Sequence, residues 1–181
     1  MGNILFTADT HFGYPKIRIP KERPFETAEE MDSVLIHNWN SVVKPNDTVY
    51  HLGDFSLNQS YETVKSYKRQ LNGKIILISG NHDWRFDTQT KLLFEDFHKH
   101  QYELYIAEKE LYVLNHCPML EWNKSHHNSF HLYGHVHGVV DNIGKTWDVG
   151  VDNNNFTPIS LDEIREIMKN RPDNRNFLKK A

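Results

Sequence analysis

Apolar residues recur along this chain as short runs separated by longer segments of helical periodicity. In the first half the runs are rich in β-branched side chains and too short for helices, so they are predicted to be buried strands. These predicted strands are residues 4–8, 48–52 and 74–79. In the segments that follow them, apolar side chains return every three or four positions, which predicts helices at residues 27–43, 60–71 and 88–97. The alternation of strand and helix indicates an α/β fold with a parallel sheet.

The second half of the chain has a different pattern, with short strands predicted close together. These strands are residues 102–107, 111–115, 129–133 and 146–151, the first two forming a hairpin. Ser160 and Glu163 have the spacing of a capping box, which predicts a final helix extending to about Asn170. We expect one domain over residues 1–170, followed by a polar, basic and loosely ordered tail over residues 171–181.

Polar side chains follow several predicted strands at the point where each strand ends. The third strand, for example, leads directly into Gly80-Asn81-His82-Asp83. Because an unpaired polar group in a core costs about 2–7 kcal/mol, such side chains make sense if the strand ends at a site. In open α/β sheets, ligands bind at the carboxyl ends of the strands. We therefore expect these strand-end residues to lie in one neighbourhood: Asp9, His11, Asp54, Asn81, His82, His116, His135 and His137.

The chemistry of this set points to metal ions. Asp9 and His11, like His135 and His137, are two residues apart, so in an extended chain each pair lies on one face. Imidazole nitrogen combined with carboxylate oxygen suits Mn²⁺, Fe, Zn²⁺ or Ni²⁺ better than Ca²⁺ or Mg²⁺. The set has more ligands than one tetrahedral ion needs, and it matches two ions about 3.5–4 Å apart.

Composition narrows the class of protein further. With 38% hydrophobic and 25% charged residues, the chain has the composition of a soluble globular protein. A net charge of −3 gives no overall basic signature for nucleic acid or an anionic membrane, and no apolar run approaches the ~20 residues of a membrane span. The single cysteine, Cys117, fits a reducing compartment, so we expect a cytoplasmic protein.

Five short motifs, taken in order, resemble those of the calcineurin-like metallophosphoesterase family. They are Asp9-x-His11, Gly53-Asp54, Gly80-Asn81-His82-Asp83, His116 and Gly134-His135-x-His137. The resemblance implies an α/β fold, a four-layer α-β-β-α sandwich of two mixed sheets. It also implies a dinuclear metal site at the carboxyl ends of the strands, and a phosphoester substrate.

The resemblance also implies a role for each matching residue. One ion would be held by Asp9, His11, Asp54 and His137, and the second by Asp54, Asn81, His116 and His135, with Asp54 bridging. His82 would contact the phosphate and protonate the leaving oxygen, and Asp83 is a candidate to orient His82. The implied reaction is phosphoester hydrolysis by in-line attack of a hydroxide that bridges the two ions.

Two departures from the protein phosphatases of this family bear on the substrate. Leu57 stands where they carry an aspartate, and Asp83 where they carry a glutamate. Both differences favour hydrolysis of a phosphodiester of nucleotide or nucleic-acid type. Two alternatives are a phosphomonoesterase acting on a small phosphorylated molecule and a catalytically silent, metal-bound interaction module. We infer no protein partner and no membrane association.

The segment over residues 14–25 is basic and proline-rich, which predicts an irregular loop. The commoner interpretation of its charges is a solvated surface. The alternative is a clamp over the substrate phosphate, with Lys16, Arg18 and Arg23 as substrate-binding residues, since the guanidinium group suits bidentate phosphate contacts.

Three further residues are predicted to support the site without binding metal. His51 is expected to pack or hydrogen-bond beside it, and Asp148 and Asp152 are expected to have turn or supporting roles around the last strand.

Overall fold

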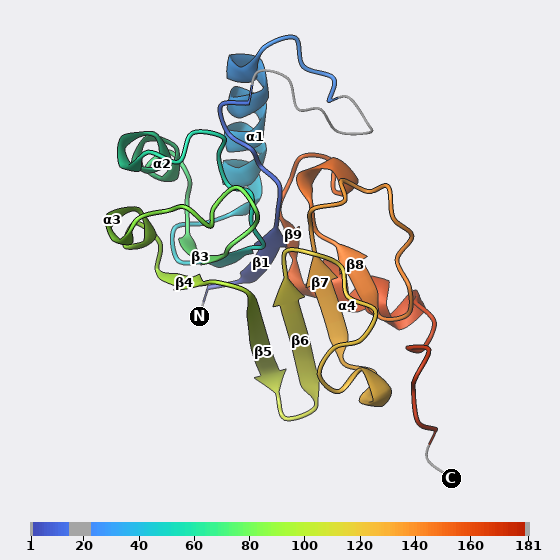
Figure 1. Cartoon of the computed structure of the whole chain (residues 1–181). Coiled ribbons are helices and arrows are strands. Elements are labelled where there is room, and N and C mark those ends of the chain that lie inside the picture. The colour runs from blue at the N-terminus through green and yellow to red at the C-terminus, as the bar shows by residue number, and fades with distance from the viewer. Residues whose placement is uncertain (1, 15–22, 180–181) are drawn as a thin grey trace.

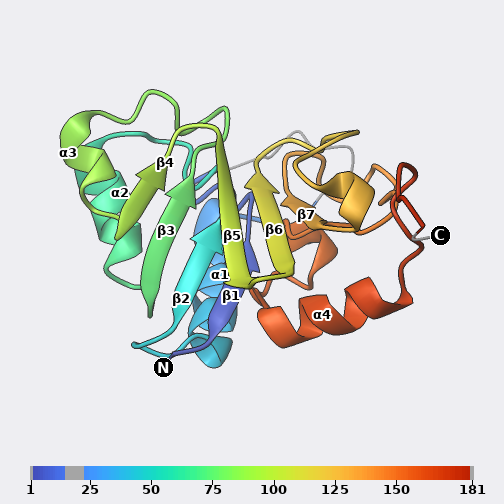
Figure 2. The ribbon, with the colours of Figure 1, turned by 90° about the horizontal axis from the view of Figure 1, so that it is seen from below.

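Figure 1 shows the whole chain. Three parallel strands form the centre of the first sheet, as the alternating pattern predicts, and they lie side by side in Figure 2. The computed structural model describes residues 2–14 and 23–179. The sheet has the order β4-β3-β2-β1-β9. Its strands are β1 (Ile4–Thr7), β2 (Thr48–His51), β3 (Lys74–Ile78), β4 (Asp96–His98) and β9 (Ile159–Ser160). Because β9 runs antiparallel to β1, the sheet is mixed.

The second sheet has the order β5-β6-β7-β8. Its strands are β5 (Gln101–Ala107), β6 (Glu110–Asn115), β7 (Phe130–Tyr133) and β8 (Thr146–Asp148). The predicted hairpin is the antiparallel pair β5–β6, whereas β6, β7 and β8 are parallel to one another. The predicted α/β fold with two mixed sheets is therefore confirmed.

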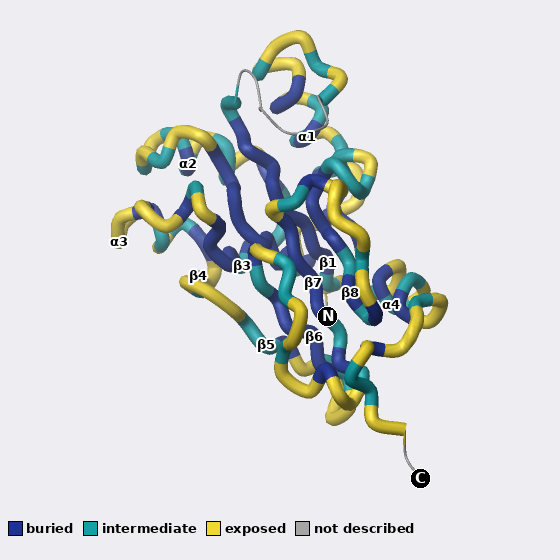
Figure 3. Tube along the Cα trace, turned by 45° about the vertical axis from the view of Figure 1, so that its right-hand side comes forward, coloured by how far each residue is buried: buried dark blue, intermediate teal, exposed yellow. Residues whose placement is uncertain are grey.

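The two sheets enclose one hydrophobic cluster between them. The first sheet contributes Phe6 and Tyr50, and the second contributes Tyr112 and Leu132. The rings of Phe6 and Tyr112 stack across the interface with centroids 6.0 Å apart. Figure 3 shows the buried residues concentrated along the strands. This cluster fixes the two sheets relative to each other, and with them the loops at their ends.

Helices cover the other face of the first sheet (Figure 2). They are α1 (Ala28–Val42), α2 (Tyr61–Lys68) and α3 (Thr88–Lys91). α1 buries Met31, Leu35 and Trp39 in a second cluster that includes Val49 and Ile75 of the sheet. None of the helices in the described part of the chain is long and apolar enough to cross a membrane.

The final helix, α4 (Leu161–Asn170), begins with the predicted capping box. The Ser160 side chain accepts a hydrogen bond from the Glu163 backbone, and the Glu163 carboxylate accepts one from the Ser160 backbone. Ile164 and Met168 then pack into the cluster between the sheets.

One predicted helix is shorter than expected. The pattern over residues 88–97 predicts a helix, but α3 ends at Lys91 and the chain then forms β4, parallel to β3. Leu92, which belongs to the predicted apolar face, is 79% exposed. For residues 96–98, pairing with the free edge of β3 is therefore more favourable than continuing the helix that the sequence pattern predicts.

The C-terminal segment is also better anchored than predicted. Asn174 is buried, and its amide nitrogen donates hydrogen bonds to the carbonyl oxygens of Ser125 and Ser129. Its side-chain oxygen accepts a hydrogen bond from the Lys145 backbone. The described part of the predicted loose tail thus packs against the short 3-10 helix η1 (Ser125–His127) and its loop. The polar composition of the segment suggested loose order, but its polar side chains anchor it through hydrogen bonds.

Replacing Trp39 by alanine should test the α1 contact. Trp39 is buried, and its indole nitrogen donates to the Asn72 carbonyl oxygen at 2.9 Å. Because the change creates a large cavity, we expect the free energy of unfolding to fall by about 3–5 kcal/mol in urea denaturation. His37→Ala, at an exposed position of the same helix, should change it by less than about 0.5 kcal/mol. Equal effects at both positions would contradict this packing.

Candidate metal centre

The polar residues that follow strands of both sheets lie at the same end of the molecule. Asp9 and His11 follow β1, Asp54 follows β2, and Asn81 and His82 follow β3. The second sheet adds its histidines in the same way: His116 follows β6, and His135 and His137 follow β7. All eight predicted strand-end residues are therefore in loops at carboxyl ends of parallel strands.

Many of these loop residues have a backbone conformation that is unusual for residues other than glycine. Positive φ angles occur at Asp9 (59°), His11 (49°), Asp54 (59°), His135 (72°) and His137 (50°). Such a conformation costs of order 1–3 kcal/mol at each residue and persists only where the surrounding structure imposes it. Its concentration at five candidate ligands is typical of a functional site.

The first group of side chains is buried, and several of its polar atoms lack hydrogen-bond partners. Ligand atoms of Asp9, His11 and His137 lie within 4.8 Å of one another. Asp9 Oδ1 and both ring nitrogens of His11 are buried with no hydrogen-bond partner. His11 Nε2 lies 3.6 Å from Asp54 Oδ2, which is too long for a hydrogen bond but suits two ligands of one ion. A divalent cation would satisfy these atoms, so the residues fit a metal site.

The second group converges on the other side of Asp54. Its carboxylate, His116 and His135 have ligand atoms within 4.8 Å of one another. His116 Nε2 lies 3.0 Å from Asn81 Oδ1 and 3.2 Å from His135 Nδ1. The other His116 nitrogen, Nδ1, lies 2.7 Å from the Leu52 carbonyl oxygen, to which it donates in the tautomer that leaves Nε2 free. Four candidate metal ligands, from Asp54, Asn81, His116 and His135, thus face a common point.

Burial explains the electrostatics of the first group. It raises the pKa of the Asp9 carboxyl to about 7 and lowers the pKa of the His11 imidazole to about 3. Burial also acts to raise the pKa of Asp54, but the neighbouring His116 and His11 outweigh it and lower that pKa. The charged Asp54 carboxylate beside the uncharged His11 imidazole is the protonation state that a cation requires of its ligands, and Asp9 would release its proton when a cation binds.

Asp152 supports the first group from behind. Its Oδ2 accepts a hydrogen bond from His137 Nδ1 at 2.7 Å, which leaves His137 Nε2 to face Asp9 and His11. A carboxylate behind a metal-binding histidine fixes its tautomer and raises its basicity. The predicted supporting role of Asp152 is consistent with this geometry.

Arg23 is part of the same support, and this corrects its predicted role in a phosphate clamp. Its guanidinium forms two bonds of 2.7 Å with the Asp152 carboxylate and donates to the carbonyl oxygens of Asp9 and Thr10. The side chain is only 4% exposed, so it is not available to a substrate phosphate. The other two candidates, Lys16 and Arg18, lie outside the described residues.

Asp83 also has a different role from the one suggested by its position beside His82. Its buried carboxylate accepts hydrogen bonds from the backbone nitrogens of Asp54, Phe55 and Gly80 at 2.6, 3.0 and 2.9 Å. Asp83 therefore joins the loops after β2 and β3, and its hydrogen bonds go to the backbone instead of to the His82 ring. Sequence adjacency gave no signal for this role, because the direction of a side chain in a turn is set by the backbone.

His82 lies at the rim of the centre. Its side chain is 32% exposed, and its Nε2 lies 4.0 Å from Asp54 Oδ2. The His82 backbone nitrogen donates to Asp54 Oδ1 at 2.8 Å, which fixes the residue relative to the central carboxylate. Its ring packs edge-on against His11 and Tyr14. His82 is thus ordered, yet accessible from outside.

Two other predicted neighbours support the loops. His51 is buried, with Nε2 at 3.0 Å from the Thr10 hydroxyl. Asp148 accepts hydrogen bonds from the backbone nitrogens of Gly138 and Gly150. Both arrangements agree with the predicted supporting roles.

Comparison with known proteins identifies the family. A family model described as the calcineurin-like phosphoesterase superfamily domain matches residues 3–150. The chain belongs to the calcineurin-like phosphoesterase superfamily. As a member, it is a metal-dependent phosphoesterase, and the family implies divalent metal ions at the clustered aspartates and histidines.

Individual relatives match this chain over different lengths. "Uncharacterized protein MJ1445" of Methanocaldococcus jannaschii is 32% identical over 170 residues, or 93% of each chain. "Gene 66 protein" of Mycobacterium phage L5 is 34% identical over 85 residues, which is 46% of this chain and 41% of that protein. The crystal structure of AQ665, a protein of unknown function from Aquifex aeolicus, has a TM-score of 0.65 at 24% identity. It covers 92% of this chain and 100% of that one, a likeness that shows the fold.

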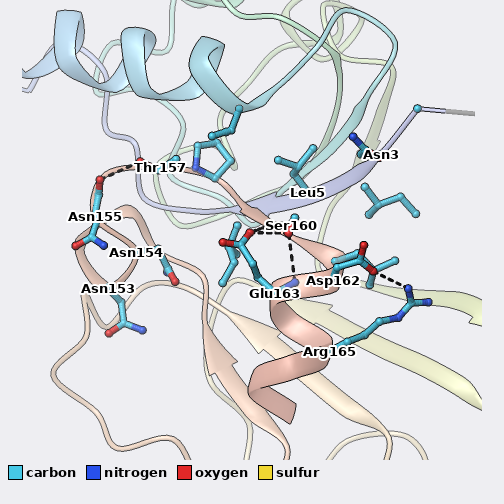
Figure 4. Close-up of a pocket in the computed structure, with 16 residues that line it drawn as sticks. Asn3, Leu5, Asn153, Asn154, Asn155, Thr157, Ser160, Asp162, Glu163 and Arg165 are labelled. Carbon is cyan, nitrogen blue, oxygen red and sulfur yellow. Dashed lines mark hydrogen bonds and ion pairs between the residues drawn. The ribbon is translucent and has the colours of Figure 1, made fainter. Parts of the chain in front are cut away.

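A cavity of about 810 Å³ lies elsewhere in this phosphoesterase, beside the amino end of β1 (Figure 4). Part of its polar lining is internally paired: Ser160 bonds with Glu163, and Arg165 with Asp162. None of the clustered aspartates and histidines of the strand-end centre lines this cavity.

Changing Asp152 to asparagine should weaken metal binding by the phosphoesterase. An amide in place of the carboxylate polarises His137 less and leaves Arg23 without its ion pair, so we expect Mn²⁺ affinity to fall about 10- to 100-fold in calorimetric titration. Asp162→Asn, at an exposed position, should leave affinity unchanged. Thermal melting in EDTA should show that both variants are folded. Wild-type affinity in a folded Asp152→Asn variant would contradict the supporting role.

Proposed function

We propose that this phosphoesterase hydrolyses a phosphodiester of nucleotide or nucleic-acid type with two divalent ions. The observation that carries the proposal is the position of Asp54 Oδ2, 3.6 Å from His11 Nε2 and 3.5 Å from His116 Nε2. One carboxylate oxygen between two groups of ligands supports a carboxylate that bridges two ions. Asp9, His11, Asp54 and His137 would hold one ion, and Asp54, Asn81, His116 and His135 the other.

The donor set favours particular metals. Two divalent cations would supply a water molecule of lowered pKa and neutralise the charge of the phosphoryl oxygens. Histidine nitrogen with carboxylate oxygen favours Mn²⁺, with Fe, Zn²⁺ and Ni²⁺ as alternatives. The free thiol of Cys117 is exposed, and this supports action in a reducing compartment such as the cytoplasm.

The difference in exposure across the centre supports a direction of substrate approach. Asp9, His11 and His137 are buried, whereas Asn81 and His135 are exposed. The substrate therefore approaches on the side of Asn81, His82 and His135, and the buried ligands exclude water from the opposite side.

His82 is placed to act on the leaving group from this side. An imidazole at the accessible rim can donate a proton from Nε2 to the departing alkoxide, and general acid catalysis of this kind contributes typically 10²–10⁴-fold. Its backbone bond to Asp54 holds the donor at a fixed position relative to the bridging carboxylate.

The residue three positions after the bridging carboxylate favours a diester over a monoester. Leu57, three residues after Asp54, is 37% exposed. An apolar side chain at this position suits a substrate that carries organic groups on two phosphate oxygens.

Hydrolysis of bis-p-nitrophenyl phosphate in Mn²⁺ tests the proposal. We expect the wild type to be active and Asp54→Ala to lose activity, because the shared ligand is gone. His82→Ala should reduce kcat by about 10²–10⁴-fold on an alkyl diester. The loss should be smaller on the p-nitrophenyl ester, since p-nitrophenolate leaves without a proton.

The control for His82 is His126→Ala, at an exposed histidine of η1, which should retain wild-type rates. Faster hydrolysis of p-nitrophenyl phosphate than of the diester would favour the phosphomonoesterase. A wild type that is inert with every metal and ester would favour the interaction module.

A further inference from the structure

Two side chains directly after the Asn81-His82-Asp83 motif are exposed. Trp84 is 58% exposed, and the Arg85 guanidinium carbon lies 4.7 Å from the centroid of its indole ring. This distance is typical of a cation–π interaction, which favours one orientation of the exposed ring. The ring therefore presents a large aromatic face on which another planar group can stack.

The turn that carries Trp84 is anchored on both sides. On one side, the buried Asp83 carboxylate accepts its three backbone hydrogen bonds. On the other, Phe86 is buried and stacks on Phe94 with ring centroids 6.2 Å apart. Backbone bonds from Asp83 to Gly80 and from Phe86 to Asp83 close the turn. The exposure of Trp84 is therefore imposed by the fold and does not result from a loose loop.

The chain itself limits how far Trp84 can be from the reacting centre. Consecutive Cα atoms are 3.80 Å apart, so the Cα of Trp84 lies within about 7.6 Å of the Cα of His82. A nucleoside attached to a phosphate beside His82 is large enough to bring its base to an indole at this distance. The backbone of Trp84 is thus close enough for its side chain to contact a group attached to the phosphate.

We propose that Trp84 and Arg85 form a stacking platform for a base of a single-stranded nucleic acid substrate. The inference deepens the proposed function and rests on it. Aromatic rings bind bases of any sequence through their π faces, and an arginine beside the ring adds stacking surface and a positive charge near the backbone. The overall negative charge of the chain does not oppose this, because the contact needs only local charge.

Matched substrates with and without bases separate this contact from binding of the phosphate. One is a single-stranded oligonucleotide, and the other has abasic residues on both sides of the same scissile phosphate. We expect the wild type to prefer the first. Trp84→Ala should remove this preference through a KM about 5- to 150-fold higher for the base-bearing strand. Trp84→Phe should keep most of the preference, because phenylalanine also stacks.

The matched control is Tyr105→Ala. Tyr105 is also an exposed aromatic residue, with Lys124 Nζ 5.2 Å from its ring centroid. It pairs with Leu111 near the turn of the β5–β6 hairpin, whereas His116 follows the opposite end of β6 (Figure 1). Tyr105→Ala should therefore leave the preference for the base-bearing strand at its wild-type value.

Binding without turnover gives a second readout. In His82→Ala with Mn²⁺ bound, titration with the oligonucleotide should quench tryptophan emission, and the added Trp84→Phe change should remove most of that quenching. An unchanged base preference in Trp84→Ala, or quenching that persists without Trp84, would overturn the platform. A wild type that hydrolyses no diester, bis-p-nitrophenyl phosphate included, would overturn the proposed function, and the fluorescence titration would still decide whether Trp84 contacts the strand.

Discussion

The Asp54 carboxylate is the group around which the two sheets are arranged. One of its oxygens lies within 4.0 Å of ring nitrogens from His11, His82 and His116, and these come from three different strand ends. Its other oxygen accepts the backbone N–H of His82. For one buried carboxylate to face all these groups, both sheets must hold their registers to within a fraction of an ångström. The aromatic packing between the sheets therefore matters as much to the centre as the ligands themselves.

Holding this arrangement has a conformational cost. The left-handed residues at the centre together cost several kcal/mol, a large part of the ~5–15 kcal/mol by which a typical domain is stable. Close backbone approach adds a further requirement: a Cβ atom at Gly80 would lie 2.2 Å from Asp54 Oδ1, and one at Gly134 would lie 2.5 Å from Asp9 Oδ2. The two hydrophobic clusters offset this cost, and a bound cation would offset more of it by satisfying the unpartnered atoms of Asp9 and His11.

Much of this arrangement could be predicted from the sequence, because strands and strand ends leave local signals. Short β-branched runs located β1, β2 and β3, and the polar residues after them marked the centre. The rest depends on contacts that no local pattern contains. The basic segment around Arg23 suggested a phosphate clamp, but the Arg23 side chain pairs with Asp152, which is 129 residues away along the chain. Residues 92–97 fit a helix equally well until the free edge of β3 is present to pair with them.

The role of Asp83 links the chemistry of the centre to its selectivity. By accepting backbone hydrogen bonds from the loops after β2 and β3, it fixes Asp54 and the turn over residues 80–86 as one rigid unit. That turn carries a candidate metal ligand, Asn81, the proposed proton donor, His82, and the exposed ring of Trp84. Their mutual positions are set by the fold before a substrate arrives, so binding does not have to order them. In the proposed function, the contacts of Asn81 with a metal, of His82 with a leaving group and of Trp84 with a base would then form on one strand at the same time.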